Sequence, residues 1–173
     1  MAEQRDAMID QWAAWLGDRL TSSNTIARST VERELKLILD IIIEMVGPYR
    51  RETKTVWHDV CEHYGRVAAA RGLAAGEVVE EMQYLRGLLT RTLSPVLAAM
   101  RARPALAIMM RLNSVLDKGI AVAVVGYTDA LVATLFSQNG VPATGADFDE
   151  SDIERQLEAI EEQLASVTRP AQT

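Results

Sequence analysis

The sequence has few of the residues that stabilise small secreted domains or build many-stranded sheets. Its 173 residues include a single cysteine, Cys61, which excludes an internal disulfide and any metal site made of several thiolates from one chain. Only 10 glycines and 5 prolines are present, which is little turn chemistry for a sheet of many strands. A reducing compartment is the simplest explanation of the cysteine usage, and we predict a cytoplasmic protein.

Positive charge is also scarce. The formal net charge of −6 argues against a nucleic-acid partner and against docking on an anionic membrane. The N-terminus lacks the apolar core of a signal peptide. The most apolar run, residues 120–136, has about the length needed to span a bilayer, but Asp129 and other polar residues interrupt it. We therefore predict a buried helix there and no membrane partner.

Apolar residues recur at helical spacing through most of the chain, and 49% of all residues are hydrophobic. The pattern predicts an all-α fold with helices over residues 3–20, 29–46, 54–71, 77–101 and 104–138. Ser29 and Glu32 have the spacing of a capping box, and Thr53 precedes the third helix as a cap. Pro95 lies inside the fourth pattern and predicts a kink or a break.

The stretch 104–138 predicts a long central helix of roughly 50 Å, at about 1.5 Å per residue. Its second half is apolar on almost every face, so we expect it to be covered on more than one side. Small residues in that half would allow a close helix contact, which we assign to the interface of a homodimer. The interface candidates are Gly119, Ala123, Gly126, Tyr127 and Ala130.

Residues 1–138 are predicted to form one domain, followed by a linker over 139–150, a helix over 151–168 and a disordered tail over 169–173. In the last helix, apolar residues follow a spacing of 4, 3, 4, 3: Ile153, Leu157, Ile160, Leu164 and Val167. This spacing is typical of a coiled-coil seam. It is equally compatible with an amphipathic helix that packs on its own domain, and the sequence leaves both open.

No motif in the sequence predicts catalysis. His58 and His63 are five residues apart, which does not place them on one helical face as a two-histidine metal site requires. Either one could serve alone as an axial haem ligand. Cys61 has no base and orienting group at a suitable spacing, so it is expected to be a buried structural thiol. We therefore predict no catalytic residue, no metal site and no resident cofactor, with haem as the alternative.

A ligand pocket is the remaining possibility for a site within the chain. Trp57, Tyr64 and Met82 would supply its apolar part. Arg86 and Asp117 are charged residues in otherwise apolar stretches. They would either line the pocket, or Asp117 would pair with Arg86 or Arg111 in a buried ion pair that sets helix register.

Two stretches, HYGRVAAARGLAAGEVVEEMQYLRGLLTRTL and RLNSVLDKGIAVAVVGYTDAL, resemble the N-terminal sensory domain of RsbR-type bacterial stress regulators. The resemblance covers about residues 30–137. It is carried by a helix that ends near a tyrosine, an RGL turn followed by glutamate, a leucine-rich helix containing Arg86, and a long helix containing Tyr127.

The resemblance implies a globin-like but non-haem bundle of about five helices, with a long central helix and a short C-terminal helix. It also implies a dimeric, cytoplasmic, regulatory domain of bacterial signalling without catalysis of its own. Ligand or partner binding would change the packing of the central helix. Members usually carry an output domain after that helix, whereas this sequence continues into a linker and an acidic helix. The chain is then either a piece of a larger regulator or a member that acts through a separate partner protein.

Overall fold

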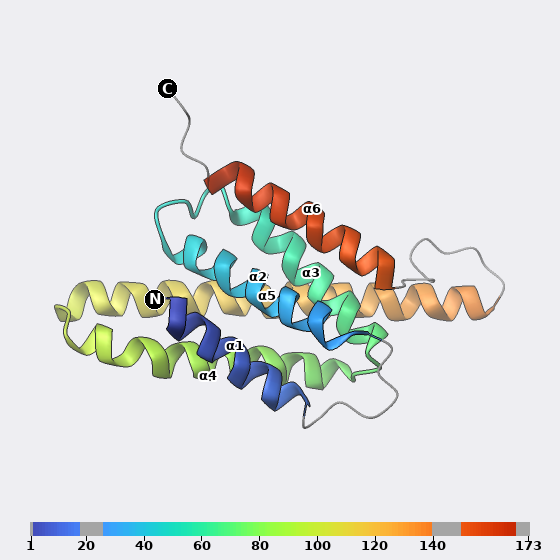
Figure 1. Ribbon diagram of the computed structural model, residues 1–173, viewed down its shortest axis with the longest axis horizontal. Coiled ribbons are helices and arrows are strands. Elements are labelled where there is room, and N and C mark those ends of the chain that lie inside the picture. Colours follow the sequence, from blue (N-terminus) through green and yellow to red (C-terminus); the bar gives the residue numbers. More distant parts are fainter. Residues whose placement is uncertain (1, 18–25, 140–149, 169–173) are drawn as a thin grey trace.

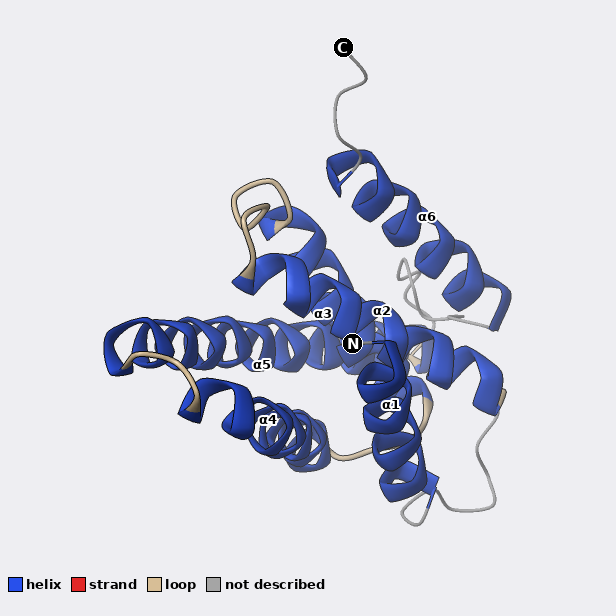
Figure 2. Ribbon diagram, turned by 60° about the vertical axis from the view of Figure 1, so that its left-hand side comes forward, coloured by secondary structure: helices blue, strands red, loops and turns tan. Residues whose placement is uncertain are grey.

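The computed structural model describes residues 2–17, 26–139 and 150–168, and these residues form six helices and no strand (Figures 1 and 2). The helices are α1 (Ala2–Gly17), α2 (Arg28–Val46), α3 (Lys54–Ala70), α4 (Ala75–Ala98), α5 (Ala102–Gln138) and α6 (Glu150–Thr168). The all-α class is confirmed, and each predicted helix is present within a few residues of its expected bounds. The described part of the chain has six helices rather than about five.

The long helix α5 runs along the whole molecule, and the other helices are arranged around it (Figure 1). Its most extensive contact is with α3, followed by α4, while α2 contacts it over a shorter length. α1 packs on α2 and α4, and α6 packs on α3 and α2 at the side away from α4 (Figure 1). The core lies between these layers and is formed mainly by leucine, isoleucine, valine and two tryptophans.

The close packing of α3 on α5 depends on glycines of both helices. A Cβ added to Gly65 of α3 would lie 2.7 Å from the backbone nitrogen of Tyr127 and closer still to the carbonyl oxygen of Ala123. A Cβ added to Gly126 of α5 would lie 2.9 Å from the carbonyl carbon of Glu62. Such distances are too short for a side chain, so these positions require glycine for the backbones to meet.

This contact corrects the predicted dimer interface. Gly119, Ala123 and Gly126 are buried against α3 of the same chain. The Tyr127 hydroxyl donates a hydrogen bond to the carbonyl of Leu73 at 2.8 Å, so this side chain is also used within the chain. Ala130 is only half-buried on α5. The small residues were predicted correctly as a close helix contact, but the partner helix is internal.

The helix starts differ from the predicted caps. The N-cap of α2 is Ala27, and the capping box predicted from Ser29 and Glu32 does not form. Instead, the carboxylate of Glu150 in α6 accepts a hydrogen bond from the backbone N–H of Ala27 at 2.8 Å. Thr53 is the N-cap of α3 as predicted, but its hydroxyl donates to a carbonyl of the preceding turn rather than capping the helix. A tertiary contact has replaced local capping at the start of α2, whereas at the start of α3 the threonine hydroxyl is used by a local turn.

α4 continues through Pro95 and ends at Ala98, so of the predicted kink or break the break does not occur. Proline lacks the backbone N–H that would donate to the carbonyl of Arg91, four residues earlier, so α4 loses one intrahelical hydrogen bond there and ends three residues later.

α6 packs on its own domain, which decides between the two alternatives for this helix. Ile153, Leu157 and Ile160 are buried against the body of the protein. The guanidinium of Arg33 in α2 donates two hydrogen bonds to the carboxylate of Glu161, at 2.8 and 2.6 Å. The 4-3 seam is therefore satisfied within the chain. The predicted linker, apart from its end residues 139 and 150, and the tail 169–173 lie outside the described residues.

The outer face of α5 is not covered, contrary to the expectation that its second half would be packed on several sides. Its large apolar side chains are between 41% and 64% exposed: Leu106, Met110, Val125, Leu131, Val132, Leu135 and Phe136. By length and composition alone α5 would be able to cross a bilayer, and only a small share of its apolar stretch is buried. The same helix buries Leu112, Leu116 and Ala123 in the core, so one face of it is committed to the protein interior.

Candidate functional site

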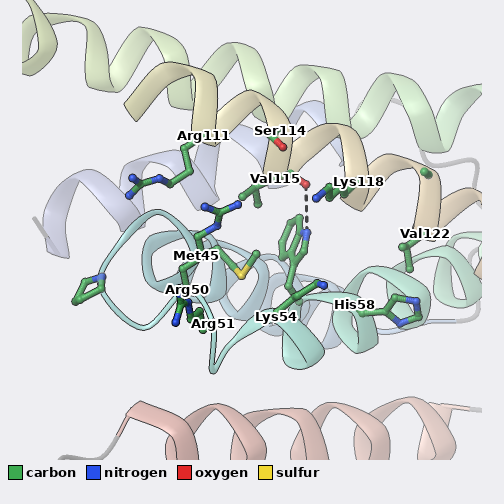
Figure 3. Close-up of a pocket in the computed structure, with 13 residues that line it drawn as sticks. Met45, Arg50, Arg51, Lys54, His58, Arg111, Ser114, Val115, Lys118 and Val122 are labelled. Atoms are coloured by element: carbon green, nitrogen blue, oxygen red, sulfur yellow. Dashed lines mark hydrogen bonds between the residues drawn. The ribbon is translucent and has the colours of Figure 1, made fainter. Parts of the chain in front are cut away.

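A cavity of about 740 Å³ lies between the turn that joins α2 to α3, the first turns of α3, and the middle of α5 (Figure 3). Its size is within the range of small-molecule sites. Its lining residues are Met45, Pro48, Arg50, Arg51, Lys54, Trp57, His58, Arg111, Ser114, Val115, Lys118, Ala121 and Val122.

The apolar floor of this cavity is held in place by the contact between α3 and α5. The indole N–H of Trp57 donates a hydrogen bond to the carbonyl of Val115 at 3.2 Å, as the dashed line in Figure 3 shows. The indole ring lies over Gly119, where an added Cβ would be 3.1 Å from Cε2 and closer still to Cζ2. Glycine at this position therefore leaves the space in which the indole sits.

Five cationic side chains line the cavity, and none of the described lining residues carries a carboxylate. Arg50, Arg51 and Lys54 come from the turn and the start of α3, while Arg111 and Lys118 come from α5 (Figure 3). This concentration of positive charge occurs in a chain whose net charge is −6. Cations grouped without a carboxylate among them produce a locally positive potential and repel one another, and an anionic ligand would relieve that repulsion.

These cations differ from most of the other arginines of the protein in having no ion-pair partner among the described residues. The arginines that pair with carboxylates lie elsewhere: Arg5, Arg28, Arg33, Arg66, Arg71, Arg86 and Arg155. Of the five in the cavity, Arg111 donates to the carbonyl of Val46 at 2.9 Å, a bond that leaves its charge uncompensated. The site thus holds charges that internal contacts do not neutralise.

The N-terminus of α3 adds to the same field. Lys54 is the first residue of this helix, and Thr53 does not cap it through its side chain. The free N–H groups of a helix start carry a partial positive charge that favours anions. The cavity therefore combines full charges with the positive end of a helix dipole.

The cavity lining includes one histidine, His58, and one serine, Ser114. His58 is 58% exposed at its side chain, and its Nδ1 lies 3.8 Å from carboxylate oxygens of both Asp59 and Glu62. Ser114 is the hydroxyl on the lining, and within the described part of the chain no hydrogen bond joins it to His58. Activation of a serine requires such a contact with a base.

The predicted pocket residues do not form one site. Trp57 lines the cavity, but Tyr64 and Met82 are fully enclosed in the core. Arg86 of α4 and Asp117 of α5 form an ion pair, so Arg86 rather than Arg111 is the partner of Asp117, but the pair is not buried as predicted because the Asp117 side chain is 64% exposed. The remaining lining residues were missed. The signal was present in the run of cations at 50–54 and in the seven-residue spacing of Arg111 and Lys118, which repeats one face of a helix.

Tyr64 belongs instead to a buried polar cluster with Arg71 and Glu81. Its hydroxyl donates to the carboxylate of Glu81, which also accepts a hydrogen bond from Arg71 at 2.8 Å. The Arg71 guanidinium lies 5.7 Å from the centre of the Tyr64 ring. Burial, followed by the negative charge of Glu81, raises the pKa of Tyr64 well above its ordinary range. Burial also raises the pKa of Glu81, against the opposing effect of Arg71.

His63 is likewise part of the interior. Its Nδ1 lies 2.8 Å from a carboxylate oxygen of Glu34, and both side chains are at most 2% exposed. This contact engages the ring of His63 with a carboxylate. Of the two predicted haem-ligand candidates, only His58 lies on the lining of the large cavity. No group of three or more metal-ligating side chains occurs among residues 2–17, 26–139 and 150–168.

Comparison of the chain with protein-family models, curated proteins and solved structures finds no match.

Proposed function

We propose that this chain is a non-enzymatic sensory or regulatory domain of bacterial signal transduction, of the stress-response type. In this proposal it is a cytoplasmic homodimer with a non-haem, globin-like arrangement of helices. It acts on a downstream signalling domain or partner protein. Support comes from the resemblance of residues 30–137 to RsbR-type sensory domains, and from the cavity described above.

The observation that carries the proposal is that the cavity lies between two structural elements. One side belongs to the α2–α3 turn and α3, and the other side to α5. An occupant that contacts both sides changes the relative stability of different packings of α5 on α3. A ligand shifts such an equilibrium only by the difference in its affinity for the two packings. A ligand that contacts both α3 and α5 would bind the two packings with different affinities.

The tight contact between α3 and α5 allows this change to reach the far half of α5. Gly65 and Gly126 bring the two backbones together beyond the cavity, so a shift at Ser114 or Lys118 is transmitted along a stiff helix. The end of α5 carries the exposed apolar side chains of Val132, Leu135 and Phe136. An output surface at this end would respond to occupation of the cavity.

The exposed apolar face of α5 is the proposed dimer interface, in place of the internal glycine contact. Contiguous apolar surface of this kind typically marks a protein or membrane contact. Helix α5 is 37 residues long, which is enough for two copies to pack side by side along several turns. The proposal commits to a second copy because positions spaced by three and four recur along this face, as helix pairs require: Thr128, Leu131 and Leu135 are exposed, and the half-buried Val124 lies one turn earlier.

Light scattering tests the interface. The wild-type chain at about 10 μM should have the mass of a dimer, and Leu131→Gln combined with Leu135→Gln should give a monomer of unchanged helicity, since an apolar interface loses affinity when polar groups are buried in it. Val96→Gln on the exposed part of α4 is the matched control and should remain dimeric. A monomeric wild-type chain would refute this part of the proposal.

A cavity-filling substitution tests the sensory mechanism without a known ligand. Ser114→Trp places an indole in the cavity and should change amide hydrogen exchange in residues 125–138, about three to seven turns away along α5. Ala107→Trp adds the same side chain at an exposed position of α5 that does not line the cavity, and it should leave exchange at 125–138 unchanged. Equal exchange profiles for both variants would contradict coupling between the cavity and the end of α5.

Haem or a small apolar ligand is the second candidate, favoured by the position of His58 on the cavity lining. A separate apolar cavity of about 380 Å³, between α1, α2, α4 and α5, could hold the small apolar ligand. An absorbance scan after addition of haemin tests the haem version. A Soret band that His58→Ala removes would support it, and the same spectrum for the wild type and this variant would exclude His58 as the ligand.

A further inference from the structure

We propose that the cavity between α3 and α5 binds an amphipathic organic anion, with a head group of two or more negative charges, such as a phosphate monoester, on an apolar body. This inference rests on the proposed function, because it names the ligand class of the same site. It concerns binding alone, and it therefore has a test that does not depend on signalling.

The head group is inferred from the number and position of the cations. Arg50, Arg51 and Lys54 lie on one side of the cavity, and Arg111 and Lys118 lie on the other (Figure 3). None of them pairs with a carboxylate in the part of the chain that the structure describes, and each retains a charge to offer a ligand. Arginine recognises phosphate and carboxylate through two parallel hydrogen bonds. Cations from opposite sides favour a group with several acceptor oxygens over a single negative charge.

The apolar part of the proposed ligand is inferred from the apolar floor of the cavity. Met45, Trp57, Val115 and Val122 line the cavity between the cations. A smaller cavity of about 170 Å³ shares His58, Ala121 and Val122 with it and adds Val125 and Glu62 to the lining. The Glu62 carboxylate lies at the end away from the five cations, so the anionic head group is assigned to the larger cavity and the apolar body to the side of Ala121, Val122 and Val125. The two cavities together provide a path along α5 that a hydrocarbon chain or ring can occupy. An inorganic anion alone would leave this surface exposed to water.

The charge of the whole chain favours a small ligand over a polyanion. A net charge of −6 repels nucleic acid and anionic bilayers at long range, whereas the local field of the cavity attracts a small anion at short range. The cations surround a recess rather than forming a flat patch, which suits a ligand that enters with its apolar part. We therefore commit to a soluble molecule, with a membrane surface as an outcome that the experiment separates.

Isothermal titration calorimetry of the full chain with octyl phosphate, below its critical micelle concentration, is the primary test. We expect saturable binding of one octyl phosphate per chain with a Kd at or below about 1 mM. Inorganic phosphate and octanol, which each carry half of the proposed chemistry, should bind at least about tenfold more weakly. No saturation by octyl phosphate, or equal affinity for any one of these simpler probes, would overturn the proposal.

A charge-matched pair of variants assigns the site. Arg50→Gln combined with Lys118→Gln removes one cation from each side of the cavity and should weaken octyl phosphate binding at least about tenfold. Arg101→Gln combined with Arg103→Gln removes the same charge from exposed residues that do not line the cavity, and should change the affinity less than about twofold. Equal losses in both variants would show that net charge, and not this cavity, determines binding.

Co-sedimentation with phosphatidylglycerol vesicles separates the membrane alternative. Binding to vesicles without binding to monomeric octyl phosphate would overturn the assignment of a soluble ligand. Hydrogen exchange of the octyl phosphate complex separates this inference from the proposed function. Binding that protects the α2–α3 turn but leaves residues 125–138 unchanged would support the ligand class and contradict the signalling role. Coupling in the Ser114→Trp variant without octyl phosphate binding would support the signalling role and overturn the ligand class.

Discussion

Gly65→Ala should be among the most destabilising single-methyl additions in this protein. The new Cβ would meet backbone atoms of α5, at 2.7 Å from the nitrogen of Tyr127 and closer to the carbonyl oxygen of Ala123. A relaxed contact is about 3.5 Å, so α3 and α5 would have to separate by roughly one ångström. No rotamer change can relieve the clash, because the atoms that collide belong to the main chain of both helices.

The free-energy cost of Gly65→Ala depends on how much packing between α3 and α5 is lost when the two helices separate. The interface between α3 and α5 is the most extensive one in the fold, and it buries Trp57 and Cys61 on one side and Val115, Gly119 and Ala123 on the other. Overpacking a core costs about 1–3 kcal/mol, and the backbone position of this clash places it at the upper end. Alanine in place of glycine returns up to about 1 kcal/mol of helix propensity. We expect a net loss of about 2 kcal/mol or more, a large share of an ordinary domain stability of about 5–15 kcal/mol.

Guanidinium chloride unfolding followed by circular dichroism at 222 nm measures this loss. Gly76→Ala is the matched control, because Gly76 also lies in a helix and a Cβ there has nothing within 4 Å. It should be neutral or stabilising by up to about 1 kcal/mol. If Gly65→Ala unfolded within about 0.5 kcal/mol of the wild type at an unchanged m-value, the close approach of α3 and α5 would not exist as described.

Two further predictions concern pH. Burial raises the pKa of Tyr64, so above about pH 10 its phenol stays protonated in the folded protein but ionises in the unfolded chain. The free energy of unfolding should therefore fall above about pH 10, by up to about 1.4 kcal/mol per pH unit. Guanidinium unfolding should show a smaller loss of stability between pH 8 and pH 11 for Tyr64→Phe than for the wild type. The hydrogen bond from Arg33 lowers the pKa of Glu161, so this ion pair stabilises the folded protein above about pH 4.3 and the stabilisation is lost as the pH falls. Both side chains are over a third exposed, so the pair should contribute less than about 1 kcal/mol. The wild type should show weaker protection of α6 from hydrogen exchange at pH 3 than at pH 6, and Arg33→Gln should lose this difference.

The sequence predicted the helices because their signal is local. A repeat of apolar residues every three or four positions shows which face of a helix is buried, and it located all six helices to within a few residues of their bounds. Where local signals competed with tertiary contacts, the prediction was weaker. The Ser29 capping box lost to a carboxylate from α6, more than a hundred residues later in the chain. Pro95 did not end α4, which continues for three more residues to Ala98.

The spacing of residues did not show which element packs against each helix face. Gly119 and Gly126 indicated correctly that another helix approaches closely. Residue spacing identifies a helix face but not the element that packs on it, so the contact with α3 was predicted as a contact between subunits. The seam of α6 had the same ambiguity. Tyr64 and Met82 were predicted to line a pocket, whereas both are enclosed by neighbouring helices. The buried polar cluster was missed, although Glu81 lies on the apolar stripe of its own helix.

The amino-acid sequence by itself determined that this protein is all-helical, that a long apolar helix lies at its centre, and that Arg86 and Asp117 could form an ion pair between helices. Only the tertiary structure decided which glycines meet which backbone, and that the outer face of α5 stays exposed. It also brought cations at 50–54 and at 111–118 to the two sides of one cavity. Helix formation depends on residues three and four positions apart, whereas a binding site depends on side chains that only packing brings together.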